Sequence, residues 1–160
     1  MPKMQIRTVD SPVGRLRLAA EDGQLTELKF GGEAVPVQCD GVNDAVLDEA
    51  ERQLAEYFRG ERQVFDLPLQ PKGTPFQLAD WQALREIPYG ETVSYGDIAR
   101  RIGRPKAFRA VGMANHSNPI SIIVPCHRVI GSDGKLTGYG GGLEVKRQLL
   151  ELEQKWKKNV

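Results

Sequence analysis

Residues 122–130 read IIVPCHRVI, and the rest of the chain can be placed around this stretch. The apolar run from Ile120 to Val124, interrupted only by Ser121, predicts a short buried strand. Pro125 ends that strand because proline has no N–H to donate to a neighbouring strand. The bend after Pro125 presents a thiol, an imidazole and a guanidinium one after another. Reactive groups at the end of a buried segment indicate a site of chemistry.

Cys126 is the candidate nucleophile of this site. The thiolate is the reactive form of cysteine, and the pKa of a thiol falls when cations such as Arg128 or a protonated His127 lie nearby. Free cysteine is also among the most buried residue types, where it packs as a small apolar side chain without reacting. The residues next to Cys126 therefore leave a catalytic and a purely structural interpretation open.

The motif PCHRV at residues 125–129 resembles the active-site signature of the O6-alkylguanine-DNA alkyltransferases, repair proteins that move an alkyl group from guanine onto their own cysteine. The resemblance covers roughly the C-terminal half of the chain, with the motifs in the order of the family. The matching segments are GTPFQ at 73–77, VSYG at 93–96, RAVG at 109–112, NP at 118–119, YGGG at 139–142 and LLELE at 149–153. This resemblance implies that Cys126 accepts the alkyl group.

The resemblance also implies partners for the cysteine. His127 would act through a water as general base on Cys126, and Glu153 would orient His127. Glu153 falls on the apolar side of a predicted closing helix, where a carboxylate needs a partner, and His127 is the obvious one. Asn118 matches the asparagine that ties a helix-turn-helix to the active site. The implied catalytic group is Cys126, His127, Glu153 and Asn118.

A second group of residues is implied to bind DNA and the target base. Arg109 matches the arginine that takes the place of a nucleotide flipped out of the duplex, and Tyr95 matches the residue that assists this rotation. The helix that carries Arg109 enters the minor groove in this family. The implied set is Tyr95, Arg109, Ala110, Arg128, Val129, Tyr139 and Gly140.

Length and composition describe an ordinary soluble protein. With 160 residues, of which 40% are hydrophobic, the chain can form one domain or two small ones. It contains no run of about eighteen apolar residues that could span a membrane. Lys3 and Arg7 are not followed by the apolar stretch of a secretory signal. We therefore expect no membrane association and a cytoplasmic location.

The cysteines and histidines, two of each, argue against disulfide and metal chemistry. Cys39 lies beside Asp40 in a polar segment, far in sequence from Cys126, which fits free thiols in a reducing compartment. The histidines and cysteines show no metal-ligand spacing. We expect no metal and no cofactor, an unreactive Cys39, and a His116 that faces solvent.

The net charge of +1 conceals an asymmetry along the chain. Residues 1–80 carry nine Lys and Arg against fourteen Asp and Glu, whereas residues 81–160 carry thirteen against seven. A basic segment of this kind is typical of a surface that binds a polyanion, although many solvated surfaces are also basic. The asymmetry is consistent with DNA as the partner of the C-terminal half.

The first half of the sequence predicts a small α/β domain. Alternating runs separated by turn residues predict an antiparallel β-meander. Apolar residues then recur at helical spacing from a possible cap at Asn43 to a stop at Gly60, which predicts a helix that covers the sheet. The predicted strands are 4–9, 14–20 and 25–30, with a further short strand at 64–67 and a linker at 68–73. The resemblance implies a ribonuclease H-like fold, and we assign residues 1–70 to it as a scaffold domain.

The second half predicts a mostly helical domain over residues 71–160. Thr74 as the cap, Pro75 at the first helical position and Gln77 three residues after the cap mark the start of a helix. Asp80 falls on the apolar stripe of this helix, at a position where the family usually has an apolar residue. A buried charge there needs a partner or a proton.

A pair of short helices follows. Ser94 caps the first, which ends at Gly103, and the second starts at Arg104-Pro105 and runs to about Asn115. The pair predicts a helix-turn-helix, and small residues in its second helix would let the backbone approach another surface closely. Beyond the cysteine motif the sequence predicts a hairpin turn at 132–134, a glycine loop at 138–142 and a closing helix from 143 to about 156.

The residues and the resemblance predict an α/β protein that repairs DNA by direct reversal. It would bind duplex DNA through the minor groove as a monomer and flip the damaged nucleotide. It would then move an alkyl group, chiefly methyl, from O6 of guanine, or from O4 of thymine, to Cys126 in a single turnover. The sequence does not decide whether it binds DNA cooperatively or which adducts it prefers.

Other functions remain open from the residues alone. A helix-turn-helix regulator would use the basic half to bind DNA and would keep Cys126 as a core residue. A thiol hydrolase would use Cys126, His127 and Glu153 on a soluble acyl substrate. Alkyl transfer to Cys126 would separate these functions, because neither the regulator nor the hydrolase would retain a methyl group.

Overall fold

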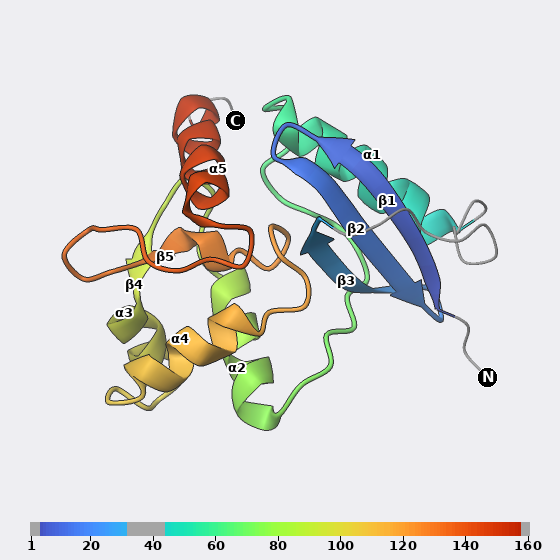
Figure 1. Cartoon of the computed structure of the whole chain (residues 1–160). Helices are drawn as coiled ribbons and strands as arrows, with labels where there is room; N and C mark the ends of the chain where they lie inside the picture. The colour runs from blue at the N-terminus through green and yellow to red at the C-terminus, as the bar shows by residue number, and fades with distance from the viewer. Residues whose placement is uncertain (1–3, 32–43, 158–160) are drawn as a thin grey trace. The chain divides into compact units, whose positions relative to one another are not determined.

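The computed structural model of the chain describes residues 4–31 and 44–157 (Figure 1). Its contacts divide it into two compact units, one that ends at Pro71 and one that begins at Lys72. Cys39 and the cap predicted at Asn43 lie outside the described residues. Within the described ranges, no helix is long and apolar enough to cross a membrane.

The N-terminal unit is an antiparallel sheet in the strand order β1–β2–β3, with helix α1 against it (Figure 1). The elements are β1 (Gln5–Ser11), β2 (Gly14–Glu21), β3 (Gln24–Phe30) and α1 (Ala45–Phe58). Side chains alternate along β2, so that Leu16 and Leu18 are buried, and α1 contacts all three strands and buries Leu47 and Leu54. Asp44 caps α1 by accepting a hydrogen bond from the Leu47 N–H at 2.9 Å. The predicted meander and its covering helix are confirmed.

The strand predicted at residues 64–67 is not formed. The amide of Gln53, on α1, binds the backbone of Asp66 in both directions, since Nε2 donates to the Asp66 carbonyl and the Asp66 N–H donates to Oε1, each at 2.9 Å. A side chain therefore satisfies the backbone groups that a strand would have used. The chain pairs with the sheet only later, where Leu69 forms an isolated parallel bridge with Leu25.

The C-terminal unit is mostly helical, as predicted (Figure 1). Its helices are α2 (Pro75–Arg85), α3 (Tyr95–Arg101), α4 (Phe108–His116) and α5 (Leu143–Trp156), with a short 3-10 helix, η2, at Cys126–Arg128. Strands β4 (Val93–Ser94) and β5 (Val129–Ile130) form a parallel pair. Helix α2 packs against α3, α4 and η2. The predicted caps Thr74 and Ser94 both form capping boxes, which confirms the predicted starts of α2 and α3.

The segment Ile120–Val124 is buried, as predicted, but it is not a strand. The Val124 N–H donates to the Ile120 carbonyl at 3.0 Å, which closes the segment into a turn. Ile122 has a φ of +70°, which is rare for a β-branched residue. The cause is Asn118, whose side chain binds the Ile120 N–H at 3.0 Å and the Val124 carbonyl at 2.8 Å and so draws the two ends together. The strand of this region is β5, after the cysteine motif.

Two other predicted boundaries change. Helix α4 starts at Phe108, later than predicted, because Pro105 lies in a turn in which the Ala107 N–H donates to the Arg104 carbonyl at 2.9 Å. The turn predicted at 132–134 is present, but no strand follows it among residues 135–142, so it does not close a hairpin. Helix α5 begins and ends where the sequence predicts.

Removing the cap of α2 should destabilise the fold. The Thr74 hydroxyl accepts a hydrogen bond from the Gln77 N–H at 3.1 Å, and the Gln77 side chain accepts one from the Thr74 N–H at 2.9 Å. We predict that Thr74→Ala lowers the free energy of unfolding in urea by about 1 kcal/mol, the usual cost of losing a threonine cap. Thr92→Ala, at an exposed threonine outside any helix, is the matched control. Equal losses in both variants would contradict the importance of the cap.

Candidate active site

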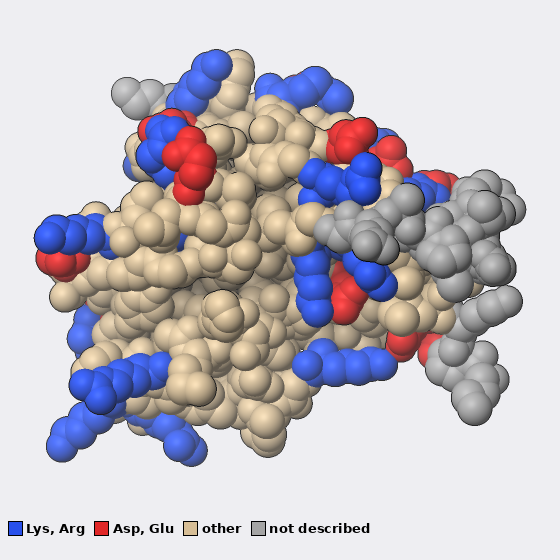
Figure 2. Space-filling model, viewed as in Figure 1, with Lys and Arg blue, Asp and Glu red and all other residues tan. Residues whose placement is uncertain are grey.

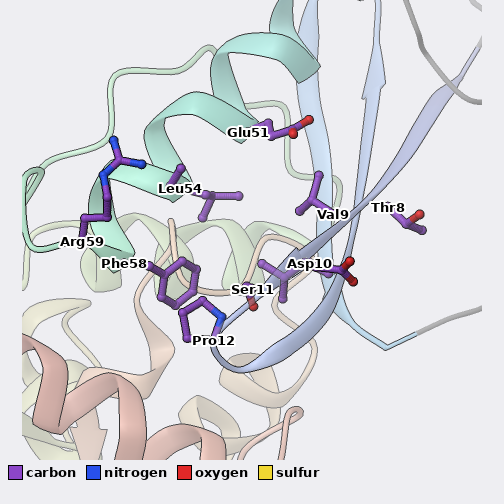
Figure 3. A pocket seen from close by; sticks show the side chains of 11 residues that line it. Thr8, Val9, Asp10, Ser11, Pro12, Glu51, Leu54, Phe58 and Arg59 are labelled. Atoms are coloured by element: carbon purple, nitrogen blue, oxygen red, sulfur yellow. The ribbon is translucent and has the colours of Figure 1, made fainter.

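The described residues form two large pockets, one in each unit, and a small one in the C-terminal unit. The large pocket of the C-terminal unit, of about 510 Å³, lies along α5 beside Leu136 and Leu150 and has neither a thiol nor an imidazole in its lining. The large pocket of the N-terminal unit, of about 490 Å³, lies between the end of β1 and α1, and its walls include Asp10, Phe58 and Arg59 (Figure 3). Its lining residues include neither a thiol nor an imidazole. The small pocket, of about 20 Å³, contains Cys126. Chemistry rather than size therefore favours the small pocket as the active site.

The small pocket brings together residues that are far apart in the sequence. Its lining residues are Tyr95, Gly112, Asn115, His116, Cys126, Gly138, Tyr139 and Gly140. Cys126, Tyr95, Tyr139 and Gly140 were predicted for the site, and the structure places them together. His116 is exposed, as predicted, yet it also lines this pocket. A volume of this size holds about one water, so a base can enter only if part of the wall moves.

Asn118 holds the thiol of Cys126 in place. Its Nδ2 donates to Cys126 Sγ at 3.3 Å and to the Val124 carbonyl at 2.8 Å, while its Oδ1 accepts from the Ile120 N–H at 3.0 Å. Every polar atom of the Asn118 amide is thus bound in one orientation. Cys126 itself is 8% exposed and is a free thiol. The predicted link between Asn118 and the cysteine is present in the structure.

Burial controls the ionisation of Cys126. It raises the pKa of the thiol to about 11, while the hydrogen bond from Asn118 and the charge of Lys146 lower it and the charge of Asp80 raises it further. The cation near the thiol is therefore Lys146 on α5, and the hypothesis that Arg128 plays this part was wrong. Lys146 is buried, and its Nζ donates to the Val129 carbonyl at 2.7 Å and to the Thr137 carbonyl at 3.2 Å. The sequence signal was a lysine on the buried side of the closing helix.

Glu153 is the centre of a buried polar cluster. Its carboxylate accepts hydrogen bonds from His127 Nε2 at 2.7 Å, from Arg128 Nε at 2.8 Å and Nη2 at 3.0 Å, and from the Gly90 N–H at 3.1 Å. Burial by itself would raise the pKa of Glu153, but His127 and Arg128 lower it well below its ordinary value. The structure brings Glu153 and His127 together as predicted. The parts played by Arg128 and Gly90 were not predicted.

His127 is a neutral imidazole in this environment. Burial lowers its pKa, although Glu153 opposes the shift, and Arg128 already supplies the positive charge that balances Glu153. His127 therefore donates its Nε2 proton to Glu153 and keeps a lone pair on Nδ1. Among the described residues, buried Nδ1 has no hydrogen-bond partner. An imidazole of this form can accept a proton at Nδ1.

The side chains of Arg128 and Val129 are buried, so neither is exposed to DNA, whereas the implied contact of the base with backbone groups near Val129 stays a prediction. Arg128 is 6% exposed, and besides Glu153 its Nη1 binds the Ile87 carbonyl at 2.7 Å. The guanidinium also lies over the Tyr89 ring, 5.6 Å from its centre. Val129 is fully buried, and its carbonyl is bound by Lys146. The expectation that Arg128 contacts DNA does not hold, because a PCHRV sequence cannot distinguish an arginine that faces inward from one that faces outward.

Helices α3 and α4 present a basic surface. On the face shown in Figure 2, Lys and Arg side chains project over these helices, at the lower left, and Asp97 of α3 pairs with Arg100. The exposed basic residues of this segment are Arg100, Arg101, Arg104, Lys106 and Arg109. Ala110 is exposed next to Arg109, as a residue at a DNA interface must be. Tyr95 lies between this surface and the pocket, and its hydroxyl bonds to the Thr137 hydroxyl.

Asp80 is fully buried and its partner is Asn115. With the amide oriented by its hydrogen bonds, Asn115 Nδ2 donates to Asp80 Oδ2 at 2.6 Å and Oδ1 at 3.1 Å, and to the Val111 carbonyl at 3.2 Å. Burial raises the pKa of Asp80 to about 7. The sequence identified Asp80 as a charge in need of a partner, but a neutral asparagine on another helix carries no signal that identifies it as that partner.

No group of three or more His, Cys, Asp or Glu side chains within residues 4–31 and 44–157 could hold a metal ion. The side chains of the site present a thiol, a neutral imidazole, a buried carboxylate and a buried ammonium group.

Comparison with known proteins identifies the family. Residues 75–155 match the family model "6-O-methylguanine DNA methyltransferase, DNA binding domain", and residues 4–71 match the "ribonuclease-like domain" of the same protein. This chain belongs to the O6-methylguanine DNA methyltransferase family. The match to the DNA-binding domain includes every residue of the polar cluster around Glu153. The family resemblance inferred from the sequence is thus confirmed.

Individual relatives are similar over nearly the whole chain. The methylated-DNA–protein-cysteine methyltransferase of Methanosarcina barkeri is 52% identical over 91% of this chain and 94% of its own length, and that of Mycobacterium tuberculosis is 54% identical over 92% and 91%. The crystal structure of M. tuberculosis O6-methylguanine methyltransferase superposes with a TM-score of 0.85 at 51% identity, covering 95% of this chain and 93% of that one. The M. tuberculosis protein in complex with DNA gives a TM-score of 0.87 at 52% identity, covering 95% and 94%. These matches confirm the mixed α/β fold.

Neutralising Glu153 should strongly destabilise this methyltransferase. We predict that Glu153→Gln lowers the free energy of unfolding by about 3 kcal/mol or more, because Arg128 would then be buried without a counter-charge. Chemical denaturation followed by circular dichroism measures the loss. Glu144→Gln is the matched control, since Glu144 pairs with Arg147 on the exposed side of the same helix and should contribute little. A small loss in Glu153→Gln would mean that the cluster does not stabilise the fold.

Proposed function

We propose that this protein repairs DNA by moving an alkyl group, chiefly methyl, from O6 of guanine to Sγ of its own Cys126. The observation that supports this most is the cluster around the thiol. Asn118 orients Cys126, and the neighbouring His127 is a neutral base held by Glu153. The membership of the family and the DNA complex of a relative that is 52% identical support DNA as the substrate. We also propose O4-alkylthymine as a second substrate, since its alkyl group is held by the same kind of carbon–oxygen bond.

The reaction needs the thiol to lose its proton as it attacks. The proton of Cys126 passes through a water to Nδ1 of His127, and Glu153 stabilises the imidazolium that forms. The sulfur electron pair forms a bond to the alkyl carbon while the bond from that carbon to O6 breaks. The electrons of the broken bond stay on guanine, which takes up one proton from water and leaves as the neutral base, while the imidazolium of His127 returns its proton to water. Because the thioether is not hydrolysed, each molecule acts once and requires no cofactor.

The target base has to leave the stack to reach Cys126. Rotating a nucleotide out of the duplex costs about a few kcal/mol. We assign Arg109 to the gap that the nucleotide leaves, because it is exposed on α4 beside small residues that let the helix approach the minor groove closely. Tyr95 assists the rotation at the mouth of the pocket. The small size of the pocket implies that the glycine loop 138–142 moves when the base enters.

We assign a different role to each half of the chain, according to which half contains the proposed catalytic residues. All proposed catalytic and DNA-binding residues belong to residues 71–160, which we assign as the DNA-binding and alkyl-acceptor domain. Residues 1–70 form the scaffold domain. Because one chain supplies the complete site, we assign the monomer as the active form.

Replacing the nucleophile should abolish transfer and leave DNA binding nearly unchanged. Serine is almost the same size as cysteine, but its oxygen is a much poorer nucleophile. Intact-mass spectrometry after incubation with a duplex that contains O6-methylguanine should show one added methyl group on the wild type and none on Cys126→Ser. Cys39→Ser is the control and should accept the methyl group normally. Methylation of Cys126→Ser would refute the assignment. No covalent product on the wild type would favour a regulator or a hydrolase.

Arg109 should matter only for duplex DNA. We predict that Arg109→Ala slows transfer from a duplex far more than transfer from free O6-benzylguanine, because only the duplex has a gap to fill. Arg101→Ala, at another exposed basic residue of this surface, is the control for general phosphate attraction. It should weaken duplex binding in a salt-dependent way without separating the two substrates. Equal losses on both substrates in Arg109→Ala would place Arg109 in the chemistry instead.

A further inference from the structure

Asp80 is a fully buried carboxylate that the transfer reaction does not use. It lies on α2, and among the described residues no Lys or Arg pairs with it. Its partner Asn115 is on α4 and lines the same pocket as Cys126. Asn115 therefore forms part of the pocket wall, and Asp80 lies behind it.

The carboxylate fixes the direction of the Asn115 amide. Both Asp80 oxygens and the Val111 carbonyl accept hydrogen bonds from Nδ2, so the amide carbonyl is turned away from Asp80. A neutral aspartic acid could instead donate a proton to that carbonyl, and the amide would then be free to reverse. The ionisation of Asp80 thus selects between two orientations of a residue in the pocket wall.

The charge of Asp80 also acts at the position of the reacting sulfur. It opposes formation of the Cys126 thiolate, which means that a negative charge at Sγ is repelled by Asp80. The alkyl carbon has to touch Sγ to react. A carboxylate attached to that carbon would therefore lie close to the same position, in an interior where water screens charges poorly.

We propose that Asp80, acting through Asn115 and through its own charge, is a specificity-determining residue that makes the pocket select neutral alkyl groups over negatively charged ones. This inference rests on the proposed alkyl transfer. An O6-carboxymethyl group would bring a negative charge to the pocket that Asn115 lines, where the charge of Asp80 repels it, whereas an uncharged O6-ethyl group of similar length would not be repelled. Asp80 is a positioning residue, since it reaches the alkyl group only through the pocket wall.

Besides Asp80, the pocket wall has a second ionisable side chain, His116, which follows Asn115 on α4, so only the comparison with Asp80→Asn assigns a pH effect to Asp80. Helix α4 presents the neutral amide of Asn115, and η2 presents the Cys126 thiol, which is protonated in this range. On α3, Asp97 pairs with Arg100 at the exposed side of the helix. Lys146 reaches the thiol from α5 and attracts anions, so the test has to read a change in selectivity rather than its absolute value.

The selectivity should depend on pH with a defined sign. Burial raises the pKa of Asp80 to about 7, so the carboxylate is charged above this pH and neutral below it. Discrimination against the carboxymethyl group should therefore be strong above pH 7 and weak below it. The ionisation of Cys126 and the leaving of guanine are common to both adducts and cancel in the ratio of their rates.

The experiment measures transfer to the full chain from duplexes that contain O6-carboxymethylguanine or O6-ethylguanine, by intact-mass spectrometry on both sides of pH 7. In the wild type, the ratio of the carboxymethyl rate to the ethyl rate should rise roughly tenfold as Asp80 is protonated. In Asp80→Asn, which keeps a hydrogen-bond acceptor for Asn115 but has no charge, the ratio should be high and independent of pH. Glu144→Gln, which neutralises an exposed carboxylate, is the control and should behave as the wild type.

Thermal melting provides an independent check that Asp80→Asn folds. The pKa of Asp80 is raised in the folded protein, so ionisation above pH 7 opposes folding, and the variant should melt at higher temperature than the wild type there. This difference should shrink as the pH falls toward 3.8, the ordinary pKa of the group. If Asp80→Asn does not fold, the pH profile is compared between the wild type and His116→Gln: a profile that persists without His116 supports the role of Asp80, and its loss overturns that role.

The outcomes separate this inference from the proposed function. Absence of ethyl transfer to Cys126 in the wild type would overturn the proposed function. Ethyl transfer with a carboxymethyl-to-ethyl ratio that is the same on both sides of pH 7 and in Asp80→Asn would leave the proposed function standing and would overturn the role of Asp80.

Discussion

The carboxylate of Glu153 is the interaction on which the active site depends. It is fully buried and binds His127 and Arg128 from η2 together with the Gly90 N–H from the loop before β4. A buried carboxylate is stable only when charges and hydrogen bonds compensate for its lost hydration. Arg128 supplies the charge, so His127 can stay neutral and available as a base. One ion pair thus holds three segments together and determines the protonation state of the catalytic histidine.

The same burial that organises the site keeps its nucleophile inactive at rest. With a pKa of about 11 the thiol of Cys126 is protonated at neutral pH, and only the thiolate reacts readily with electrophiles and oxidants. Asn118 holds the sulfur in place through its hydrogen bond to Sγ, and the charge of Lys146 favours the thiolate once the proton is lost. For a protein that uses its cysteine once, a thiol that reacts only in the presence of its substrate avoids loss to side reactions.

Sequence periodicity is sufficient to predict the β-meander, α1 and α5, and the capping residues Thr74 and Ser94 predict where α2 and α3 begin. The cap of α1 is Asp44 and not the predicted Asn43. The pairing of Glu153 with His127 could also be predicted, since a carboxylate on an apolar stripe needs a partner. The segment Ile120–Val124 differs from the predicted strand because the Asn118 side chain binds its backbone at both ends, and hydrophobicity carries no signal of these hydrogen bonds. The sequence does not show that the Arg128 side chain points inward, because its partner is Glu153, which lies 25 residues later on α5.

The position of Glu153 on α5 has a consequence for the order of events during synthesis. Cys126, His127 and Arg128 leave the ribosome well before the carboxylate that completes their cluster. The sheet and α1, which lie within residues 4–71, are made first and can fold as the chain emerges. Until α5 docks, Arg128 has no buried counter-charge and the segment around the thiol cannot close. The site around Cys126 therefore forms late in folding, and a newly made chain becomes active only when α5 packs against η2.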